Sequence, residues 1–344
     1  MFERIKINNF RGVRSAEISG MRCVNLFWGK NNCGKSTLLD SLFLISGLSN
    51  PQLPLTINFF RDYVRVSEKD LSLNFYNFDT SNQIEISAKN EHTRTLKINL
   101  VLSPTIGIDI KTNNLGASSN LLQRDFGYRL DYSYDNEPYH SELIFKSLDM
   151  KANQITNSQY NETLLCKYLT PKFKLNTSDK ALKEMFENKD ERFLLDTLRI
   201  ISPEIIDLQL TEDAILVDMG AEQRIPINLM GDGIRKLLAI VVGIYECRNG
   251  VLLIDEIDNG LHYSVIGKVW EAIMSSAIVN NTQVFATTHS IDSLKGFNQA
   301  VKVINCGNNV SAFKLLHTPT GELKAFHYLH NQLDYAIQQE IEIR

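Results

Sequence analysis

The pattern of apolar and polar positions separates a strand-rich first half of the chain from a second half in which short apolar runs alternate with helical patterns. At the start, FERIKINNF alternates with period two and RSAEISG follows a turn at Gly12, which predicts a β-hairpin. CVNLFWG predicts a third strand, and apolar residues at helical spacing over 37–45 predict a helix. The chain is therefore expected to open with three strands, a glycine-rich loop and a helix.

Alternating segments continue from about residue 83 to residue 145, where Asn, Gly, Ser and Pro separate them. This region predicts an antiparallel β lobe. Residues 178–199 carry apolar side chains on one side and charges on the other, which predicts one amphipathic helix packed on the body of the protein.

Beyond residue 200 the pattern becomes α/β. MGDGIRKLLAIVVGIYEC predicts a glycine loop that enters a helix, residues 264–277 predict a second helix, and VLLIDE, TQVFATTHS and VKVINCG predict buried strands. Short buried strands between helices are typical of a mainly parallel sheet covered on both faces, with sites at the carboxyl ends of its strands. We expect residues 1–80 and 200–344 to form one discontinuous domain and residues 81–199 to form an inserted β-rich and helical lobe.

Composition restricts the partners and the compartment. The 344 residues are 43% hydrophobic, and 36 Lys+Arg against 40 Asp+Glu give a net charge of -4, so no global attraction to nucleic acid is expected. The longest apolar run, Leu237 to Tyr245, is about half of the ~20 residues that a transmembrane helix needs. The charged start MFERIKINNFRG is unlike a signal peptide, so we expect a cytoplasmic protein without a membrane partner. The five scattered cysteines include no C-x-x-C pair and indicate neither a disulfide framework nor a zinc site.

The segment FWGKNNCGKSTLLDSLF satisfies G-x-x-x-x-G-K-[ST], the phosphate-binding loop. Backbone N–H groups and the helix N-terminus are suited to phosphate, Lys35 to the β and γ phosphates of ATP, and Ser36 to Mg²⁺. The competing interpretation is a glycine turn with an incidental lysine. Cys33 fills a variable position, is no candidate nucleophile, and is expected to be exposed in the empty site. The predicted ATP-binding residues of the loop are Gly29, Lys30, Asn31, Asn32, Cys33, Gly34, Lys35, Ser36 and Thr37.

Two later strands end in residues suited to hydrolysis. VLLIDE predicts a strand that places Asp255 where it can bind the metal ion, and Glu256 where a carboxylate can activate the attacking water. For this segment taken alone, the alternative interpretation is a cap at the end of a strand. ATTHS places His289 where an imidazole can contact the γ phosphate. A lone histidine in a loop is more often incidental, and it is the order and spacing of the motifs that favour the functional interpretation.

NLMGDGIRK places Gly231, Asp232 and Gly233 at the mouth of a helix, which predicts a second anion-binding nest. Each chain has one phosphate loop and therefore binds one ATP, with one γ phosphate. The second nest is therefore expected to act in the nucleotide site of a neighbouring subunit. The alternative is a plain helix cap in which Asp232 is a first-turn acid.

The phosphate loop, MGDGIRK, LLIDEIDNGLH and TTHS, in this order, resemble ABC-type ATPases of the SMC and RecF type, and most closely the small prokaryotic AAA-family ATPases akin to the ATPase half of OLD-type nucleases. The resemblance covers roughly residues 1–60 and 200–310. It implies an α/β P-loop NTPase of the ABC-ATPase type, with a mixed N-terminal sheet and a mainly parallel core sheet. It also implies a head that dimerises around ATP. The implied roles are β/γ-phosphate binding by Lys35, Mg²⁺ binding by Ser36 and Asp255, base catalysis by Glu256, γ-phosphate sensing by His289, signature contacts in trans by Gly231, Asp232 and Gly233, and a place near the nucleotide for Arg11.

Two departures from the family pattern refine this expectation. Gly231 stands where the signature usually has Ser, so the trans contact lacks a hydroxyl hydrogen bond of roughly 1.5–3 kcal/mol. His262 stands where transporter cassettes have Asp, which fits the OLD-like group. Residues 290–344 are too few for the nuclease domain of OLD proteins, and the middle region is too short and too β-rich for a long coiled coil.

Three function classes follow from the resemblance. The favoured one is an ATP-switched regulatory ATPase, a homodimer or higher even oligomer that controls a separately encoded effector, in a group commonly associated with anti-phage defence. The alternative is a DNA-engaging repair or maintenance ATPase, and the third, a hydrolysis-dead scaffold, is disfavoured by Glu256. The DNA hypothesis depends on basic residues that solvent or a nucleotide would explain equally well: Arg4, Lys6, Arg11, Arg14, Arg22 and Lys30.

Overall fold

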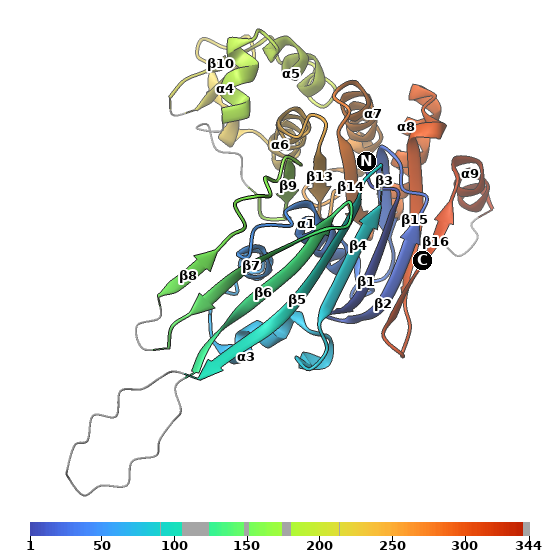
Figure 1. Cartoon of the computed structure of the whole chain (residues 1–344). Coiled ribbons are helices and arrows are strands. Elements are labelled where there is room, and N and C mark those ends of the chain that lie inside the picture. Colours follow the sequence, from blue (N-terminus) through green and yellow to red (C-terminus); the bar gives the residue numbers. More distant parts are fainter. Residues whose placement is uncertain (90, 105–123, 148–150, 174–179, 213, 340–344) are drawn as a thin grey trace, which may run out of the picture.

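One mixed sheet of thirteen strands runs through the protein in the order β8-β7-β6-β5-β4-β1-β2-β16-β15-β3-β14-β13-β9 (Figure 1). The computed structural model describes residues 1–89, 91–104, 124–147, 151–173, 180–212 and 214–339. The strands of this sheet are β1 (Arg4–Phe10), β2 (Val13–Ser19), β3 (Val24–Trp28), β4 (Ile84–Lys89), β5 (Thr93–Pro104), β6 (Arg124–Tyr134), β7 (Glu137–Phe145), β8 (Ala152–Ile155), β9 (Cys166–Leu169), β13 (Val251–Ile254), β14 (Gln283–Thr288), β15 (Val310–His317) and β16 (Glu322–Tyr328).

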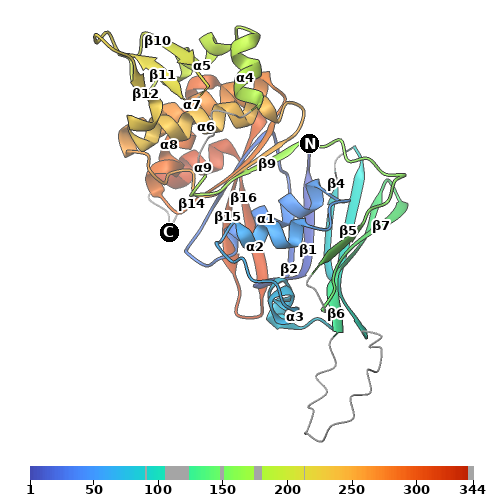
Figure 2. The same ribbon diagram turned by 90° about the vertical axis from the view of Figure 1, so that its left-hand side faces the viewer.

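Helices cover both faces of the parallel part of this sheet, and a small second sheet lies beside α5 (Figure 2). Within the described ranges no helix is long and apolar enough to cross a membrane. The helices are α1 (Lys35–Ser46), α2 (Leu53–Phe59), α3 (Glu68–Leu71), α4 (Lys180–Glu187), α5 (Glu191–Leu198), α6 (Asp232–Glu246), α7 (Tyr263–Val279), α8 (Ile291–Ile304) and α9 (His330–Gln338), and the small sheet has the order β10 (Asp207–Leu210), β11 (Ile215–Asp218), β12 (Ile225–Pro226).

The predicted N-terminal hairpin is confirmed, and it extends into the β-rich middle region. β1 pairs with β2 from Arg4 opposite Ser19 to Phe10 opposite Val13. On its other side β1 pairs antiparallel with β4, and β5, β6, β7 and β8 continue the same ladder. The strands of the predicted inserted lobe therefore share one sheet with the hairpin, and the domain division at residues 80 and 81 stays a prediction.

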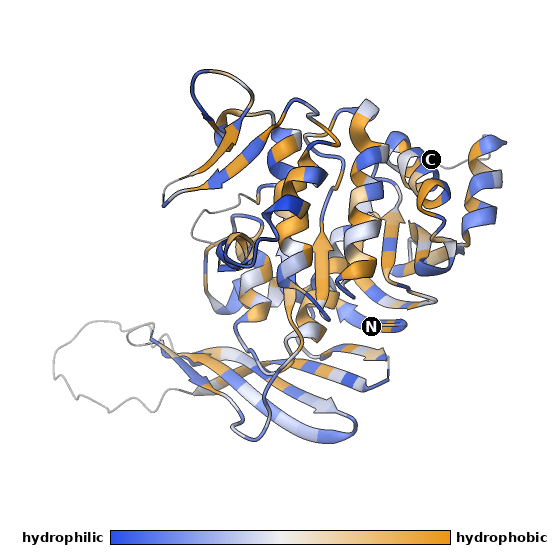
Figure 3. Cartoon of the chain, turned by 90° about the horizontal axis from the view of Figure 1, so that it is seen from above, coloured by the Kyte–Doolittle hydropathy of each residue, from blue (hydrophilic) through white to orange (hydrophobic). Residues whose placement is uncertain are grey.

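The parallel core is also confirmed, over the strand order β15-β3-β14-β13-β9. Every residue of β3, β13 and β14 is buried, as expected for strands covered on both faces. Of these three strands β13 is apolar throughout, and Figure 3 shows by contrast the alternating colours of the antiparallel strands. Since parallel strands end at one edge, the loops that follow β3, β13 and β14 lie side by side.

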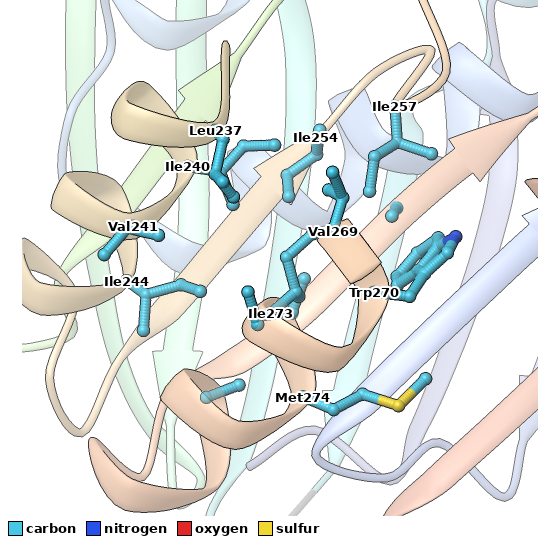
Figure 4. Packing of buried hydrophobic residues seen from close by; sticks show 14 of the residues in the cluster. Leu237, Ile240, Val241, Ile244, Ile254, Ile257, Val269, Trp270, Ile273 and Met274 are labelled. Carbon is cyan, nitrogen blue, oxygen red and sulfur yellow. The ribbon is translucent and has the colours of Figure 1, made fainter. Parts of the chain in front are cut away.

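Side chains alternate between the two faces of the parallel core and build two hydrophobic clusters. Leu26, Leu252 and Val284 belong to the cluster that contains the inner faces of α6, α7 and α8. Phe27, Leu253 and Phe285, each one position further along, belong to the cluster that contains α1. Figure 4 shows how the first cluster closes the space between α6, β13 and α7. Its labelled members are Leu237, Ile240, Val241, Ile244, Ile254, Ile257, Val269, Trp270, Ile273 and Met274.

Two predicted elements are wrong. VKVINCG is not a strand: its first four residues end α8, in which Phe297, Ala300 and Val301 have helical spacing and are buried. Ser290 begins that helix, because its side chain accepts hydrogen bonds from two backbone N–H groups of the first turn. The amphipathic helix predicted over 178–199 is two helices, α4 and α5, separated where Lys189 adopts a φ of 63°. Residues 178 and 179 lie outside the described residues.

Candidate functional site

The predicted phosphate loop joins β3 to α1 and depends on glycine at both ends. At Gly29 an added Cβ would lie 2.6 Å from the carbonyl oxygen of Leu315 and 2.8 Å from Sγ of Cys33. Gly34 is the N-cap of α1 with a φ of 97°, a conformation that L side chains rarely adopt. The loop can therefore curl tightly against β15 only with glycine at these two positions.

Lys35 lies within the curve of this loop and is only 9% exposed. Its Nζ donates hydrogen bonds to the carbonyl oxygens of Gly29 at 2.8 Å and Lys30 at 2.9 Å. The first N–H groups of α1 have no partner within the helix and face the same space, beside the half-buried Ser36 and Thr37. A buried ammonium group together with free helix N–H groups forms a donor set that fits phosphate.

Cys33 corrects one expectation. Its side chain is buried, 6% exposed, between Gly29 and Lys35, whereas we expected an exposed thiol in the empty site. Burial raises the pKa of the Cys33 thiol above its ordinary value, and the nearby charge of Lys35 offsets part of this rise. The thiol is therefore a poor chemical probe of the loop, because thiolates rather than thiols react.

Asp255 and Glu256 follow β13 directly, and one hydroxyl group holds both residues. Oγ1 of Thr287, on β14, donates to Oδ1 of Asp255 at 2.6 Å and accepts from the backbone N–H of Glu256 at 2.9 Å. Asp255 is 8% exposed, and Glu256 is half-buried. Glu256 has a φ of 51°, so its backbone is in the left-handed region that a residue other than glycine rarely adopts.

The residues present fit a Mg²⁺ site of the kind that nucleotide-binding proteins build. Asp255 supplies a carboxylate and Ser36 a hydroxyl group, which are oxygen ligands that Mg²⁺ prefers. In the part of the chain that the structure describes, no group of three or more His, Cys, Asp or Glu residues could hold a metal by itself. A site of two protein oxygen atoms suits Mg²⁺, which keeps waters and binds substrate phosphates as its other ligands.

His289 follows β14 at the same edge, and Thr288 and His289 both face Asp258. Oγ1 of Thr288 donates to Oδ1 of Asp258 at 2.5 Å, and Nε2 of His289 lies 3.9 Å from Oδ2 of the same carboxylate. The His289 side chain is 48% exposed. Because the register places Thr288 beside Trp28, the end of β14 lies next to the start of the phosphate loop.

The predicted signature loop begins α6. Gly231 is the N-cap, exposed, and a Cβ added there would have no atom within 4 Å. Asp232 forms an ion pair with Arg235 one turn later, and Gly233 follows it in the first turn. Space is therefore open at Gly231, where this 15-residue helix begins with N–H groups that suit an anion.

Lys236, also in α6, reaches the loop after β13. Its Nζ donates to the carbonyl oxygen of Glu256 at 2.6 Å and to that of Asn259 at 2.8 Å. Burial lowers the pKa of Lys236 to about 8, while the charges of Asp258, Glu256 and Asp255 oppose this shift. The sequence did not predict a role for Lys236 or Thr287, although they lie within the motifs MGDGIRK and ATTHS. The spacing of residues in a motif does not show which backbone atoms a side chain contacts.

Arg11 lies in the turn between β1 and β2 and points inward. Its guanidinium group forms an ion pair with Asp40 of α1, four residues after Ser36, and donates to Oδ1 of Asn58 at 2.6 Å. Arg61 donates to the same Asp40 carboxylate at 2.7 Å. Burial raises the pKa of Asp40, and the two guanidinium groups offset part of this rise. The structure thus places Arg11 against the phosphate-loop helix, and its place near the nucleotide stays a prediction.

Fold and site together define a P-loop ATPase with an SMC-head-like fold. Residues 24–294 match the family model described as "AAA domain, putative AbiEii toxin, Type IV TA system", and the chain belongs to this family. It is 22% identical over 380 residues to the "ATP/GTP phosphatase" of Helicobacter pylori, a match that covers 99% of both chains. A match of 93 residues to an uncharacterized protein of Methanocaldococcus jannaschii is 32% identical and covers 26% of this chain and 41% of the relative.

Among solved structures, the chain is similar to an SMC head bound to the C-winged helix domain of ScpA. The TM-score is 0.50, and the match covers 98% of this chain and 99% of that chain at 14% identity. At this identity the likeness shows the fold alone, an α/β P-loop ATPase head with a large mixed sheet. The predicted fold class and the ATPase activity are confirmed by these comparisons together.

Proposed function

We propose that the edge formed by the loops after β3, β13 and β14 is the ATP hydrolysis site. The observation that carries this proposal is the convergence of these three loops from neighbouring parallel strands, with a phosphate-binding donor set, two carboxylates and an imidazole. Lys35 would bind the β and γ phosphates, and Ser36 and Asp255 would hold Mg²⁺. The bound metal ion would neutralise phosphate charge.

Glu256 is the proposed general base, which accepts a proton from the attacking water, and His289 is the proposed contact to the γ phosphate. Asp258 faces His289 and can orient its ring. The remaining predicted nucleotide contacts are Gly29, Lys30, Asn31, Asn32, Cys33, Gly34 and Thr37 of the loop, together with Arg11.

We further propose that two subunits close around ATP, so that Gly231, Asp232 and Gly233 of one subunit contact the nucleotide of the other. The open space around Gly231 supports this arrangement, because a partner's nucleotide could approach the start of α6, where helix N–H groups suit an anion. Trans sites of this kind imply a homodimer or a higher even oligomer.

Mixing two inactive variants tests the composite site. Lys35→Ala removes the phosphate-loop lysine, and Gly231→Arg places a bulky side chain where the structure leaves room for it within one subunit. Each homodimer is expected to be inactive, but half of the dimers in an equal mixture pair one intact loop with one intact signature. Turnover of the mixture is expected to recover to about a quarter of wild type if the subunits exchange freely. An active Gly231→Arg homodimer, or a mixture without recovery after verified exchange, would argue against trans sites.

The biological role that we propose is ATP-gated control of a separately encoded effector protein, in prokaryotic anti-phage defence. The family description names a putative AbiEii toxin and a type IV TA system, and the similar SMC head was solved with a bound partner domain. The alternative, DNA binding, loses support because four of the six basic N-terminal residues form ion pairs with acidic side chains. Arg4 and Lys6 pair with Glu17, Arg14 with Glu322, and Arg11 with Asp40.

ATPase assays and native purification separate these two roles. We expect ATP turnover to change by less than about twofold with double-stranded DNA at low salt, because basic residues that already pair with acidic side chains release few counterions from DNA. We also expect a stoichiometric protein partner to copurify with the wild type from its native host and to be lost from Lys35→Ala. Strong DNA stimulation with a steep salt dependence would instead support the RecF-like or SMC-like alternative.

A further inference from the structure

We infer that Thr287 and Lys236 are positioning residues that hold the backbone of Glu256 from its two sides and thereby set the orientation of its carboxylate. This inference rests on the proposed role of Glu256 as the base. Thr287 fixes the N–H group of Glu256, and Lys236 fixes its carbonyl oxygen. Both polar atoms of this one residue's backbone are therefore bound by side chains that come from other elements, β14 and α6.

The backbone of Glu256 needs such support. Its φ of 51° is in a region that costs a residue other than glycine of order 1–3 kcal/mol and persists only where the surroundings hold it. The next residue is also held in place, because the N–H group of Ile257 donates a hydrogen bond to the carbonyl oxygen of Thr287 at 2.9 Å. Without these contacts the backbone of Glu256 would relax toward negative φ, and the orientation of the Glu256 carboxylate would change.

Thr287 and Lys236 each contact a different second group, so mutations at the two residues should have different effects. The hydroxyl group of Thr287 also donates to Asp255, the proposed metal ligand, at 2.6 Å. Nζ of Lys236 binds two carbonyl oxygens, those of Glu256 and Asn259, and neither belongs to a proposed metal ligand. Loss of Thr287 should therefore disturb both metal binding and the chemical step, whereas loss of Lys236 should disturb the chemical step alone.

Thr287→Val keeps the shape of the side chain and removes the hydroxyl group, and Thr287→Ser keeps the hydroxyl group. We expect Thr287→Val to lower kcat by about 10- to 100-fold and to raise the Mg²⁺ concentration for half-maximal rate, with a smaller change in the KM for ATP. Thr287→Ser is expected to stay within about threefold of wild type. The control is Thr282→Val at the other end of β14, where the buried hydroxyl group binds the carbonyl oxygens of Ile244 and Cys247. It should lose similar thermal stability and keep kcat.

Lys236→Met tests the second contact with a side chain of similar length. We expect kcat to fall by about tenfold with an unchanged Mg²⁺ requirement, and Lys268→Met, an exposed lysine on α7, to have no effect. Because it alters α6 rather than β14, this variant keeps the inference testable if Thr287→Val does not fold. An unchanged kcat in soluble Thr287→Val or Lys236→Met would overturn the inference.

The Glu256→Gln background separates this inference from the proposed function. If Glu256 is the base, Lys236→Met added to Glu256→Gln should lower kcat little further, since the group that Lys236 positions is already gone. If Glu256→Gln alone leaves turnover unchanged, the proposed base is wrong. If Glu256→Gln is inactive while both positioning variants keep their kcat, the base assignment stands and the positioning role is wrong.

Discussion

Alanine in place of Lys35 is expected to lower kcat/KM for ATP by about 10²- to 10⁴-fold, because two charge-assisted hydrogen bonds to phosphate are worth about 3–6 kcal/mol together. The structure supports an effect of this size, since the ammonium group is buried within the loop and is held by the carbonyl oxygens of Gly29 and Lys30. The measurement is ATP turnover over a range of ATP concentrations, together with the direct binding of a fluorescent ATP analogue.

The matched control for this prediction is Lys268→Ala. Lys268 is exposed on α7 and forms an ion pair with Glu271, one turn away, at 3.3 Å. An exposed pair of this kind contributes at most about 1 kcal/mol to stability, so turnover should be unchanged. If Lys35→Ala binds and hydrolyses ATP as the wild type does, the loop after β3 is not the phosphate site.

Glutamine in place of Glu256 is expected to lower kcat by about 10²- to 10⁴-fold while ATP still binds, since an amide cannot accept the proton from the attacking water. The substitution keeps the size of the side chain and the backbone contacts to Thr287 and Lys236. In contrast to Lys35→Ala, the variant should therefore accumulate in the ATP-bound state. Phosphate release reports the loss of turnover, and light scattering with and without ATP reports the closed dimer.

Glu246→Gln is the control for the second prediction. Glu246 ends α6, far along the helix from its N-terminal loop, and forms an ion pair with Lys167 of β9. We expect wild-type turnover from this variant. A Glu256→Gln protein with wild-type kcat would move the role of base to another group, and one that no longer binds ATP would indicate that the carboxylate is needed for binding.

Much of the fold was predictable because its strongest patterns are local. The hairpin, the phosphate-loop helix and the buried strands β13 and β14 have periodicities that few alternatives satisfy. The errors occur where local and tertiary information differ. Residues 301–304 taken alone predict a strand, but they form the last turn of α8, in which Val301 completes the buried face of the helix. Strand β9 was missed because it is four residues long and because its pairing partner among the described strands is β13, 85 residues later in the sequence.

In the candidate site, too, some features follow from local motifs and others depend on the tertiary structure. The sequence proposes Lys35, Asp255, Glu256 and His289 as site residues, because each belongs to a motif in which residue type and spacing carry the chemistry. It gave no sign that Cys33 is buried, since burial there depends on how the loop curls against β15 and α1. Nor did it predict that Arg11 pairs with Asp40, since the two residues lie on different elements that only the folded sheet brings together.

The sequence by itself determined the class of this protein, an α/β ATPase with a phosphate loop, because glycine, lysine and carboxylate positions in fixed order leave few other interpretations. Only the tertiary structure decided how the reactive residues are held. The hydroxyl group of Thr287 and the ammonium group of Lys236 hold the left-handed backbone of Glu256 through contacts between residues 31 and 20 positions apart in the sequence. Such contacts depend on the register of parallel strands and on the packing of α6 against β13, and no local pattern encodes either one.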